Sequence, residues 1–273
     1  MKKLLVLLFV LVMAIPLIAQ EKSLNVMSLN GATGIFVIPT AKVAFPDDTM
    51  GFNAGYHTNF FKPFDGDLKM NHMVQANFGF LKMFEVSGLF DIQPDVYQAN
   101  PNDLLTGFKF QLPFGSVPIA FGANFQYHNM GQDNVTHWAF QVYGAITYSA
   151  EMFNWPVDTT LVVGHTFIED ESDSNIDFGI GLDMIIFPKQ LKNFLHLLID
   201  YSNFSYSADP WGADAWVRGV FNTGLRVDVS QIPALKKFNF AIDIFLADAF
   251  DSKDTFLGKG RSFGTGVTFG MGF

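Results

Sequence analysis

The chain has 273 residues, of which 26 are acidic and 17 basic, and its formal net charge is −9. This acidity argues against nucleic acid as a partner, and the absence of cysteine excludes disulfides, thiol chemistry and a lipidated cysteine. Charged residues make up only 16%, below the roughly one quarter of a typical soluble domain, while phenylalanine occurs 32 times. So much aromatic surface requires either a large core or surroundings other than water.

The first segment in chain order combines positive charge with an apolar run. Lys2 and Lys3 precede apolar residues 4–18, and the small residue Ala19 follows them. This layout is typical of a secretory signal peptide, and the run is shorter than the roughly 20 residues of a membrane-spanning helix. We therefore predict a signal peptide over residues 1–19, cleaved after Ala19.

Twelve segments with alternating side chains follow, each roughly 9 to 14 residues long. They span residues 49–60, 72–81, 84–92, 104–112, 117–128, 136–149, 158–168, 175–187, 194–207, 217–230, 237–250 and 262–273. In the eighth, for example, Ile176, Phe178 and Ile180 alternate with Asp177 and Gly179. A period of two indicates a strand with two unlike faces, and strands that cross a membrane need about 9 to 11 residues.

One face of these segments is large and apolar, whereas the other carries glycine, asparagine, serine and scattered charges. A soluble β-sandwich also alternates, but it predicts shorter strands and a face of exposed lysine, glutamate and threonine. A sheet in lipid must pair all its backbone groups and therefore closes on itself. The predicted fold is all-β: a transmembrane antiparallel up-and-down β-barrel of about twelve strands over residues 49–273. Fourteen strands are the alternative if residues 34–38 pair with a neighbour.

The connections between the segments alternate in length and charge. Acid-rich loops at 91–103, 129–135, 169–175, 207–216 and 251–261 are predicted to be extracellular, and turns at 82–83, 113–117, 151–158, 188–193 and 231–237 periplasmic. Long outer loops and short periplasmic turns are typical of bacterial outer-membrane barrels. We therefore expect a bacterial outer-membrane protein that contacts membrane lipids, lipopolysaccharide and the barrel-assembly machinery.

Charged residues on the small-residue face are candidates for lining a pore. They are Glu85, Lys109, Asp177, Asp183, Asp200, Arg218, Arg226, Asp228 and Asp243. Charge on this face needs water or a partner, which indicates a wet or ion-paired lumen. Twelve strands predict a narrow passage, and the excess of acid favours cations or neutral polar solutes.

The last segment alternates large apolar residues with four glycines. We expect these glycines to widen the bore locally or to leave room for a plug, and the segment to close the barrel against 49–60. Its residues Phe269, Met271 and Phe273 resemble the C-terminal assembly signal that the barrel-insertion machinery reads.

Patterns for catalysis and metal binding are weak. Six histidines show no i, i+4 pair, 169–175 lacks the glycine of a calcium loop, and 257–262 lacks the spacing of a phosphate loop. We predict no enzyme activity, no cofactor and no metal, with His57, His128, His137 and His196 facing the lumen. The alternatives are a barrel enzyme of the lipase or protease type, using His137 or His165, and a closed structural or adhesive barrel.

Residues 20–48 precede the first alternating segment and are expected to form a plug or a short extra strand. Residues 31–57 read GATGIFVIPTAKVAFPDDTMGFNAGYH. This stretch resembles the start of the YjbH-like outer-membrane barrels, which are associated with exopolysaccharide biosynthesis, through Gly34, Pro39, Thr40 and Ala41. The resemblance implies a role in making or exporting surface polysaccharide and carries over no catalytic residue. The functional hypothesis is a narrow channel, or a conduit for small solutes or polysaccharide.

Overall fold

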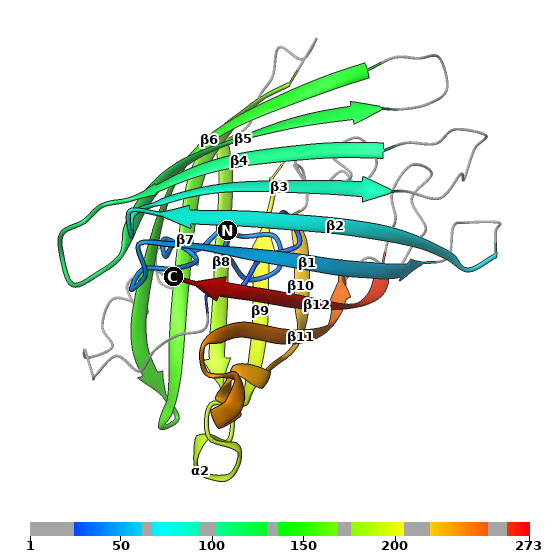
Figure 1. Cartoon of the computed structure of the whole chain (residues 1–273). Helices are drawn as coiled ribbons and strands as arrows, with labels where there is room; N and C mark the ends of the chain where they lie inside the picture. Colours follow the sequence, from blue (N-terminus) through cyan, green and yellow to red (C-terminus); the bar gives the residue numbers. More distant parts are fainter. Residues whose placement is uncertain are drawn as a thin grey trace, which may run out of the picture.

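The computed structural model describes residues 25–61, 67–92, 102–129, 136–168, 176–204, 219–250 and 261–273. Twelve antiparallel strands form a closed barrel in which each strand pairs with its neighbours in sequence (Figure 1). They are β1 (Met50–Phe61), β2 (Lys69–Phe80), β3 (Phe84–Ile92), β4 (Asn102–Gln111), β5 (Ile119–Asn129), β6 (Thr136–Met152), β7 (Trp155–Ile168), β8 (Ile176–Ile185), β9 (Leu195–Ser202), β10 (Val220–Asp228), β11 (Phe238–Ala247) and β12 (Ser262–Gly272). This confirms the predicted fold. None of the described helices is long and apolar enough to cross a membrane.

Side chains alternate between the lumen and the exterior along the strands. In β8, Ile176 is 71% exposed whereas the adjacent Asp177 is fully buried. Every strand contributes at least one large apolar side chain to the exposed exterior, for example Phe78 of β2 and Phe125 of β5. A closed barrel with a polar interior and an apolar outside is the architecture of a bacterial outer-membrane protein. This arrangement places the chain in the bacterial outer membrane.

β12 closes the barrel against β1, as the sequence predicts. Phe60 pairs with Phe263 at one end, and Met50 and Phe273 exchange backbone hydrogen bonds at the other. The inward glycines of β12 do not leave open space. A Cβ atom on Gly266 would lie 2.0 Å from the ring of His57, and one on Gly270 would lie 1.7 Å from Asn53 Oδ1. The expected local widening is therefore wrong, because side chains of β1 lie over these glycines.

The end of the barrel at which β1 begins has short connections. Residues 81–83 join β2 to β3, and β6 and β7 are joined by Phe153 and Asn154, both with positive φ, which suits a two-residue hairpin. The predicted turn at 151–158 is too long, since Glu151 pairs with Pro156. Residues 112–118 join β4 to β5, α2 (Pro188–Leu191) lies between β8 and β9, and η1 (Val229–Gln231) and η2 (Pro233–Leu235) lie between β10 and β11.

The opposite end carries the connections predicted to be extracellular, and most of their residues lie outside the described part of the chain. Short turns mark the periplasmic end of outer-membrane barrels. We therefore assign the end with residues 81–83 and 153–154 to the periplasm and the other end to the cell exterior.

Residues 25–48, here named the plug segment, lie inside the barrel. The blue trace that precedes β1 runs among the strands (Figure 1). Its apolar side chains Met27, Ile35, Phe36 and Ile38 are buried, and most of them belong to a core cluster shared with wall residues such as Leu198 and Phe245. Residues 34–38 add no strand to the barrel, since Gly34 and Pro39 form only an isolated bridge.

Candidate functional site in the barrel lumen

The plug segment is folded on itself by its own backbone hydrogen bonds. Isolated bridges join Met27 to Thr33 and Gly34 to Pro39, and the N–H of Leu29 donates to the carbonyl of Phe36. A Cβ atom on Gly34 would lie 2.4 Å from the carbonyl oxygen of Ile38, so only glycine permits this close approach. The plug segment is thus a compact unit with its own backbone pairing.

Apolar side chains of the plug segment fit into places where the barrel wall has glycine. A Cβ atom on the wall glycine would lie within about 3 Å of the facing side chain in each case. The pairs are Gly181 with Ile35, Gly179 with Ile38, Gly55 with Met27 and Gly51 with Phe45. The wall and the plug segment are therefore complementary in shape, because any larger wall residue would occupy the same space.

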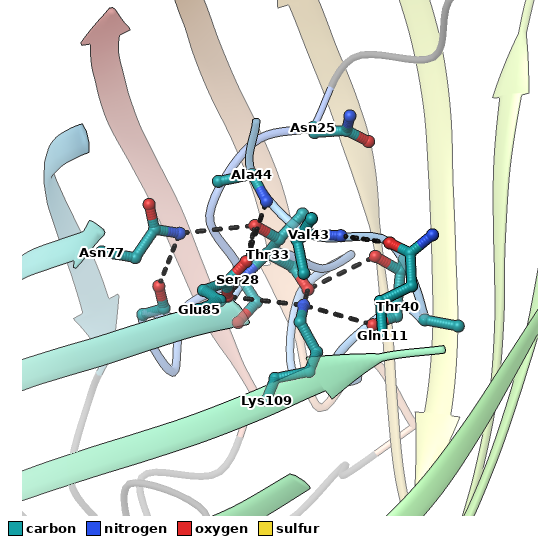
Figure 2. Close-up of polar contacts among 12 residues, drawn as sticks. Asn25, Ser28, Thr33, Thr40, Val43, Ala44, Asn77, Glu85, Lys109 and Gln111 are labelled. Carbon is teal, nitrogen blue, oxygen red and sulfur yellow. Dashed lines mark hydrogen bonds and ion pairs between the residues drawn. The ribbon is translucent and has the colours of Figure 1, made fainter. Parts of the chain in front are cut away.

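A buried ion pair of the wall, formed by Glu85 and Lys109, holds the part of the plug segment around Thr33, Thr40 and Ala44 (Figure 2). Glu85 accepts hydrogen bonds from the N–H and hydroxyl of Thr33, at 2.7 and 2.6 Å, and from the N–H of Ala44 at 2.9 Å. Lys109 Nζ donates to the carbonyls of Thr33 and Thr40 at 3.1 and 3.3 Å and lies 3.4 Å from Glu85. The two charges thus satisfy each other and the backbone of the plug segment.

Asp200 of β9 holds the tip of the plug segment. One of its oxygens, Oδ2, accepts the backbone N–H groups of Phe36, Val37 and Ile38 at 2.9, 2.7 and 3.3 Å. The other oxygen, Oδ1, accepts a hydrogen bond from Asn222 at 2.7 Å. Successive backbone N–H groups that converge in this way form an anion-binding nest, here filled by a wall carboxylate.

Arg226 of β10 binds the plug segment from a third side. Its guanidinium forms a two-point ion pair with Asp243, at 2.7 and 3.0 Å, and donates to the carbonyls of Met27 and Gly34 at 3.2 and 3.4 Å. His57 Nε2 lies 3.2 Å from Asp243 Oδ2, one of the two oxygens that accept from Arg226. Arg226 is thus fully buried with its charge and several of its N–H groups engaged.

Further polar contacts join the plug segment to the wall around its circumference. Gln75 donates to the carbonyl of Leu29, Thr147 accepts the N–H of Ala41, Gln111 accepts the N–H of Val43, and Lys42 pairs with Asp158 at 2.5 Å. A polar cavity of about 10 Å³ remains between Lys42, Asp158 and Asp183, which is close to the space of one water molecule. The plug segment therefore packs closely against the wall on several sides of the lumen.

The predicted pore-lining residues fall into two groups. Glu85, Lys109, Asp200 and Arg226 hydrogen-bond to the plug segment, and Asp243 supports it through Arg226.

The other predicted residues bond within the wall. Asp177 accepts hydrogen bonds from Gln141 and Thr166, Asp183 lies 2.6 Å from His196, and Asp228 accepts from Ser230 and Gln231. Arg218 and the side chains of His128 and His137 lie outside the described residues. His57 and His196 are buried in the lumen, and His165 lies against Phe167, with ring centroids 4.6 Å apart.

Several uncharged contacts were missed because only charged residues were considered as pore-lining. Gln75, Gln111, Thr147 and Asn222 point inward and contact either the plug segment or Asp200. The inward phase of their strands was the signal that could have found them. No group of three or more His, Cys, Asp or Glu side chains suited to a metal ion occurs in the described part of the chain.

The residues that resemble the YjbH-like barrels all lie in the plug segment. Gly34 and Pro39 form its second bridge, the carbonyl of Thr40 accepts from Lys109, and the N–H of Ala41 bonds to Thr147. At the other end of the chain, Phe269 and Met271 face the exterior and Phe273 is 61% exposed.

No protein-family model and no curated protein matches the sequence. Solved structures with a similar shape include a KdgM porin, with a TM-score of 0.48 and 9% identity over 81% of this chain and 99% of that one. The COG4313 outer membrane channel from Pseudomonas putida F1 gives 0.44 and 11%, over 83% and 96%. LpxR from Salmonella typhimurium gives 0.44 and 8%, over 81% and 100%. Likeness at this level leaves the function of the chain to be inferred from its own lumen.

Proposed function

We propose that the chain is a narrow outer-membrane channel for cations or neutral polar solutes, including polysaccharide, and that the plug segment closes it in the described conformation. The observation that carries this proposal is the set of charged wall residues that surround the plug segment. Glu85, Lys109, Asp200 and Arg226 are all buried, yet they bond to a separate segment and not only to one another.

A lumen that stays shut has no need for such charges. Well-packed apolar side chains fill the interior of a protein at equal or lower free energy than a buried ion pair. In an open state, by contrast, water can take over the hydrogen bonds that the plug backbone now makes. A charged wall therefore suits a barrel that is both closed and open, which favours a channel over a structural or adhesive barrel with a closed lumen.

The sign of the wall charge supports a preference for cations or neutral solutes. Among the described wall residues of the predicted set, Glu85, Asp177, Asp183, Asp200, Asp228 and Asp243 face the lumen with only Lys109 and Arg226 as fixed positive charges. Rings of carboxylates favour cations in a pore. Anions would therefore meet an unfavourable potential.

Polysaccharide is the finer part of the proposal and has two supports. One is the resemblance of residues 31–57 to the YjbH-like barrels. The other is a set of buried carboxamide side chains on the wall, which includes Asn71, Gln75, Asn124, Gln126 and Gln141. Each carboxamide both donates and accepts hydrogen bonds, so that such a surface suits a solute rich in hydroxyl groups.

The selectivity can be tested on a variant that lacks residues 25–46. We expect its reversal potential in a potassium chloride gradient to show cation preference, and liposome swelling to be fast with small neutral sugars and slower with longer oligosaccharides. Anion preference would contradict the assigned selectivity. Equal exclusion of neutral sugars of every size, beside measurable ion flow, would contradict the saccharide assignment.

The proposal includes no catalytic role for the lumen histidines. His57 and His196 each contact a wall aspartate, and these pairs lie in the wall of the lumen. We expect the plug-deleted barrel to release no product from ester or peptide substrates. Hydrolysis that disappears in the His137→Ala or His165→Ala variant would instead favour the barrel-enzyme alternative.

Membrane lipids, lipopolysaccharide and the barrel-assembly machinery are the other proposed partners. An apolar groove on the exterior, lined by Phe125, Trp138, Phe140 and Phe167, lies toward the extracellular ends of β5, β6 and β7. Aromatic side chains near a membrane interface pack well against acyl chains. We propose that lipid chains of the outer leaflet fill this groove.

We also propose that Phe269, Met271 and Phe273 form the assembly signal. Deleting Phe273 removes the two backbone hydrogen bonds with Met50 and the terminal aromatic ring. The expected result is a marked loss of folded barrel from the outer membrane, measured by heat-modifiable migration on gels. The matched control is Phe90→Ala, which removes an exterior aromatic ring in the middle of the chain. Normal insertion of the deletion variant would contradict this assignment.

A further inference from the structure

We propose that the plug segment is a gate that Asp200 latches at its tip and that leaves the lumen only through the periplasmic mouth. The inference rests on the proposed channel function, and it adds the direction of opening and the residue that holds the closed state. It follows from where the two ends and the tip of the plug segment lie along the barrel axis.

Both ends of the plug segment lie at the periplasmic mouth. The carbonyl of Asn25 accepts a hydrogen bond from Asn239, the second residue of β11, which starts at this mouth. The ring of Phe45 lies over Gly51 and Gly79, at the periplasmic ends of β1 and β2. The first described residue of the segment and the ring of Phe45 therefore lie at the same mouth.

The tip of the plug segment lies much farther toward the outside. Phe36, Val37 and Ile38 bond to Asp200, the third residue from the extracellular end of β9. Ile38 also lies against Gly179, in the extracellular half of β8. The plug segment is thus a loop that extends from the periplasmic mouth into the lumen, toward the extracellular end.

This topology fixes the direction of opening. A loop whose two ends share one mouth can be withdrawn through that mouth without threading a chain end through the barrel. Outward ejection would require the base to cross the whole lumen, but Met50, two residues after the plug segment, is paired with both Phe80 and Phe273. Because the loop has its own backbone pairing, it can move as a unit. The force that opens the gate must therefore act from the periplasmic side.

The latch at the tip is a single side chain. Asp200 is fully buried and one of its oxygens binds three consecutive N–H groups, so withdrawal of the loop breaks all three bonds together. Hydrogen bonds to a charged acceptor are about twice as strong as those to a neutral one. Asp200→Asn keeps the shape of the side chain but removes the charge, which weakens the latch without removing the plug segment.

The first test is the open probability of single channels in planar bilayers. We expect Asp200→Asn to raise it about tenfold or more, which corresponds to the loss of one strong hydrogen bond. The matched control is Asp67→Asn, which removes a carboxylate charge from an exposed residue just before β2. An unchanged open probability in Asp200→Asn, in a protein whose plug-deleted form conducts, would overturn the latch.

The second test uses engineered disulfides. Because the chain has no native cysteine, the introduced cysteines can pair only with each other within the chain. In the Asp200→Asn background, Ile38→Cys with Gly179→Cys ties the tip to the wall, because a Cβ atom on Gly179 would lie 3.1 Å from Ile38 Cγ1. Phe45→Cys with Gly51→Cys ties only the base, where a Cβ atom on Gly51 would lie 2.4 Å from Phe45 Cγ. Withdrawal of the plug segment toward the periplasm needs the tip to move and leaves the base in place.

Oxidation should therefore abolish the openings of the tip-tied protein, with recovery on reduction, and leave those of the base-tied protein unchanged. Loss of openings in the base-tied protein would overturn the proposal that the plug segment leaves through the periplasmic mouth. Unchanged openings in the oxidised tip-tied protein would overturn the gate itself, while the channel function would stand if the plug-deleted barrel still conducts. A plug-deleted barrel without conductance would instead refute the proposed function.

Discussion

Replacing Arg226 with methionine is expected to destabilise the folded protein by about 3–5 kcal/mol, the usual cost of leaving a buried charge without its partner. The guanidinium is fully buried, and its removal would take the two-point ion pair from Asp243, which keeps its contact with His57, and the N–H donors from the plug carbonyls of Met27 and Gly34. Methionine has a similar length but offers no N–H group, so that the volume is largely kept while the bonds are lost.

This loss can be measured as the free energy of urea unfolding in lipid vesicles. The control is Lys82→Met, because Lys82 is an exposed residue of the turn between β2 and β3 and should change stability by less than about 0.5 kcal/mol. A destabilisation below about 1 kcal/mol for Arg226→Met would show that Asp243 and the plug carbonyls find other partners.

The Glu85 and Lys109 pair predicts the second large effect on stability. A single substitution should destabilise the protein, and the second substitution should restore stability. Lys109→Met alone leaves Glu85 as a buried charge and should cost about 3–5 kcal/mol. Adding Glu85→Gln removes that charge while retaining an oxygen that can accept from the Thr33 hydroxyl and the Ala44 N–H, which both bond to Oε2 of Glu85. The double variant should therefore recover most of the lost stability.

A double-mutant cycle on unfolding free energies isolates this coupling. Residues in direct contact couple by about 0.5–3 kcal/mol, and a buried pair belongs at the upper end of that range. Additive effects of the two substitutions would contradict the description of Glu85 and Lys109 as one unit that holds Thr33.

The barrel itself could be predicted from the sequence because it depends on a local pattern. Side-chain alternation reports the two faces of each strand directly, so the twelve segments and their inward residues follow from the sequence. Where the pattern is ambiguous, pairing decides: residues 151–158 were expected to form a turn, yet only Phe153 and Asn154 do so, and the residues on either side of them belong to β6 and β7.

The arrangement within the lumen could not be predicted in the same way. Contacts such as Asp200 with Phe36 join residues 164 positions apart, and no local periodicity encodes such a pairing. The glycines of β12 show the same limit. Their bareness was visible in the sequence, but that His57 and Asn53 lie over them depends on the register between β1 and β12.

The central claim is that the plug segment fills a polar lumen that conducts when this segment is removed. It is tested most directly by single-channel recording of the full-length protein beside a variant that lacks residues 25–46, at matched amounts of folded protein. The account predicts long closed periods with rare openings for the full-length protein and a steady conductance for the variant. A variant that folds into the same heat-modifiable barrel and passes no current would contradict it.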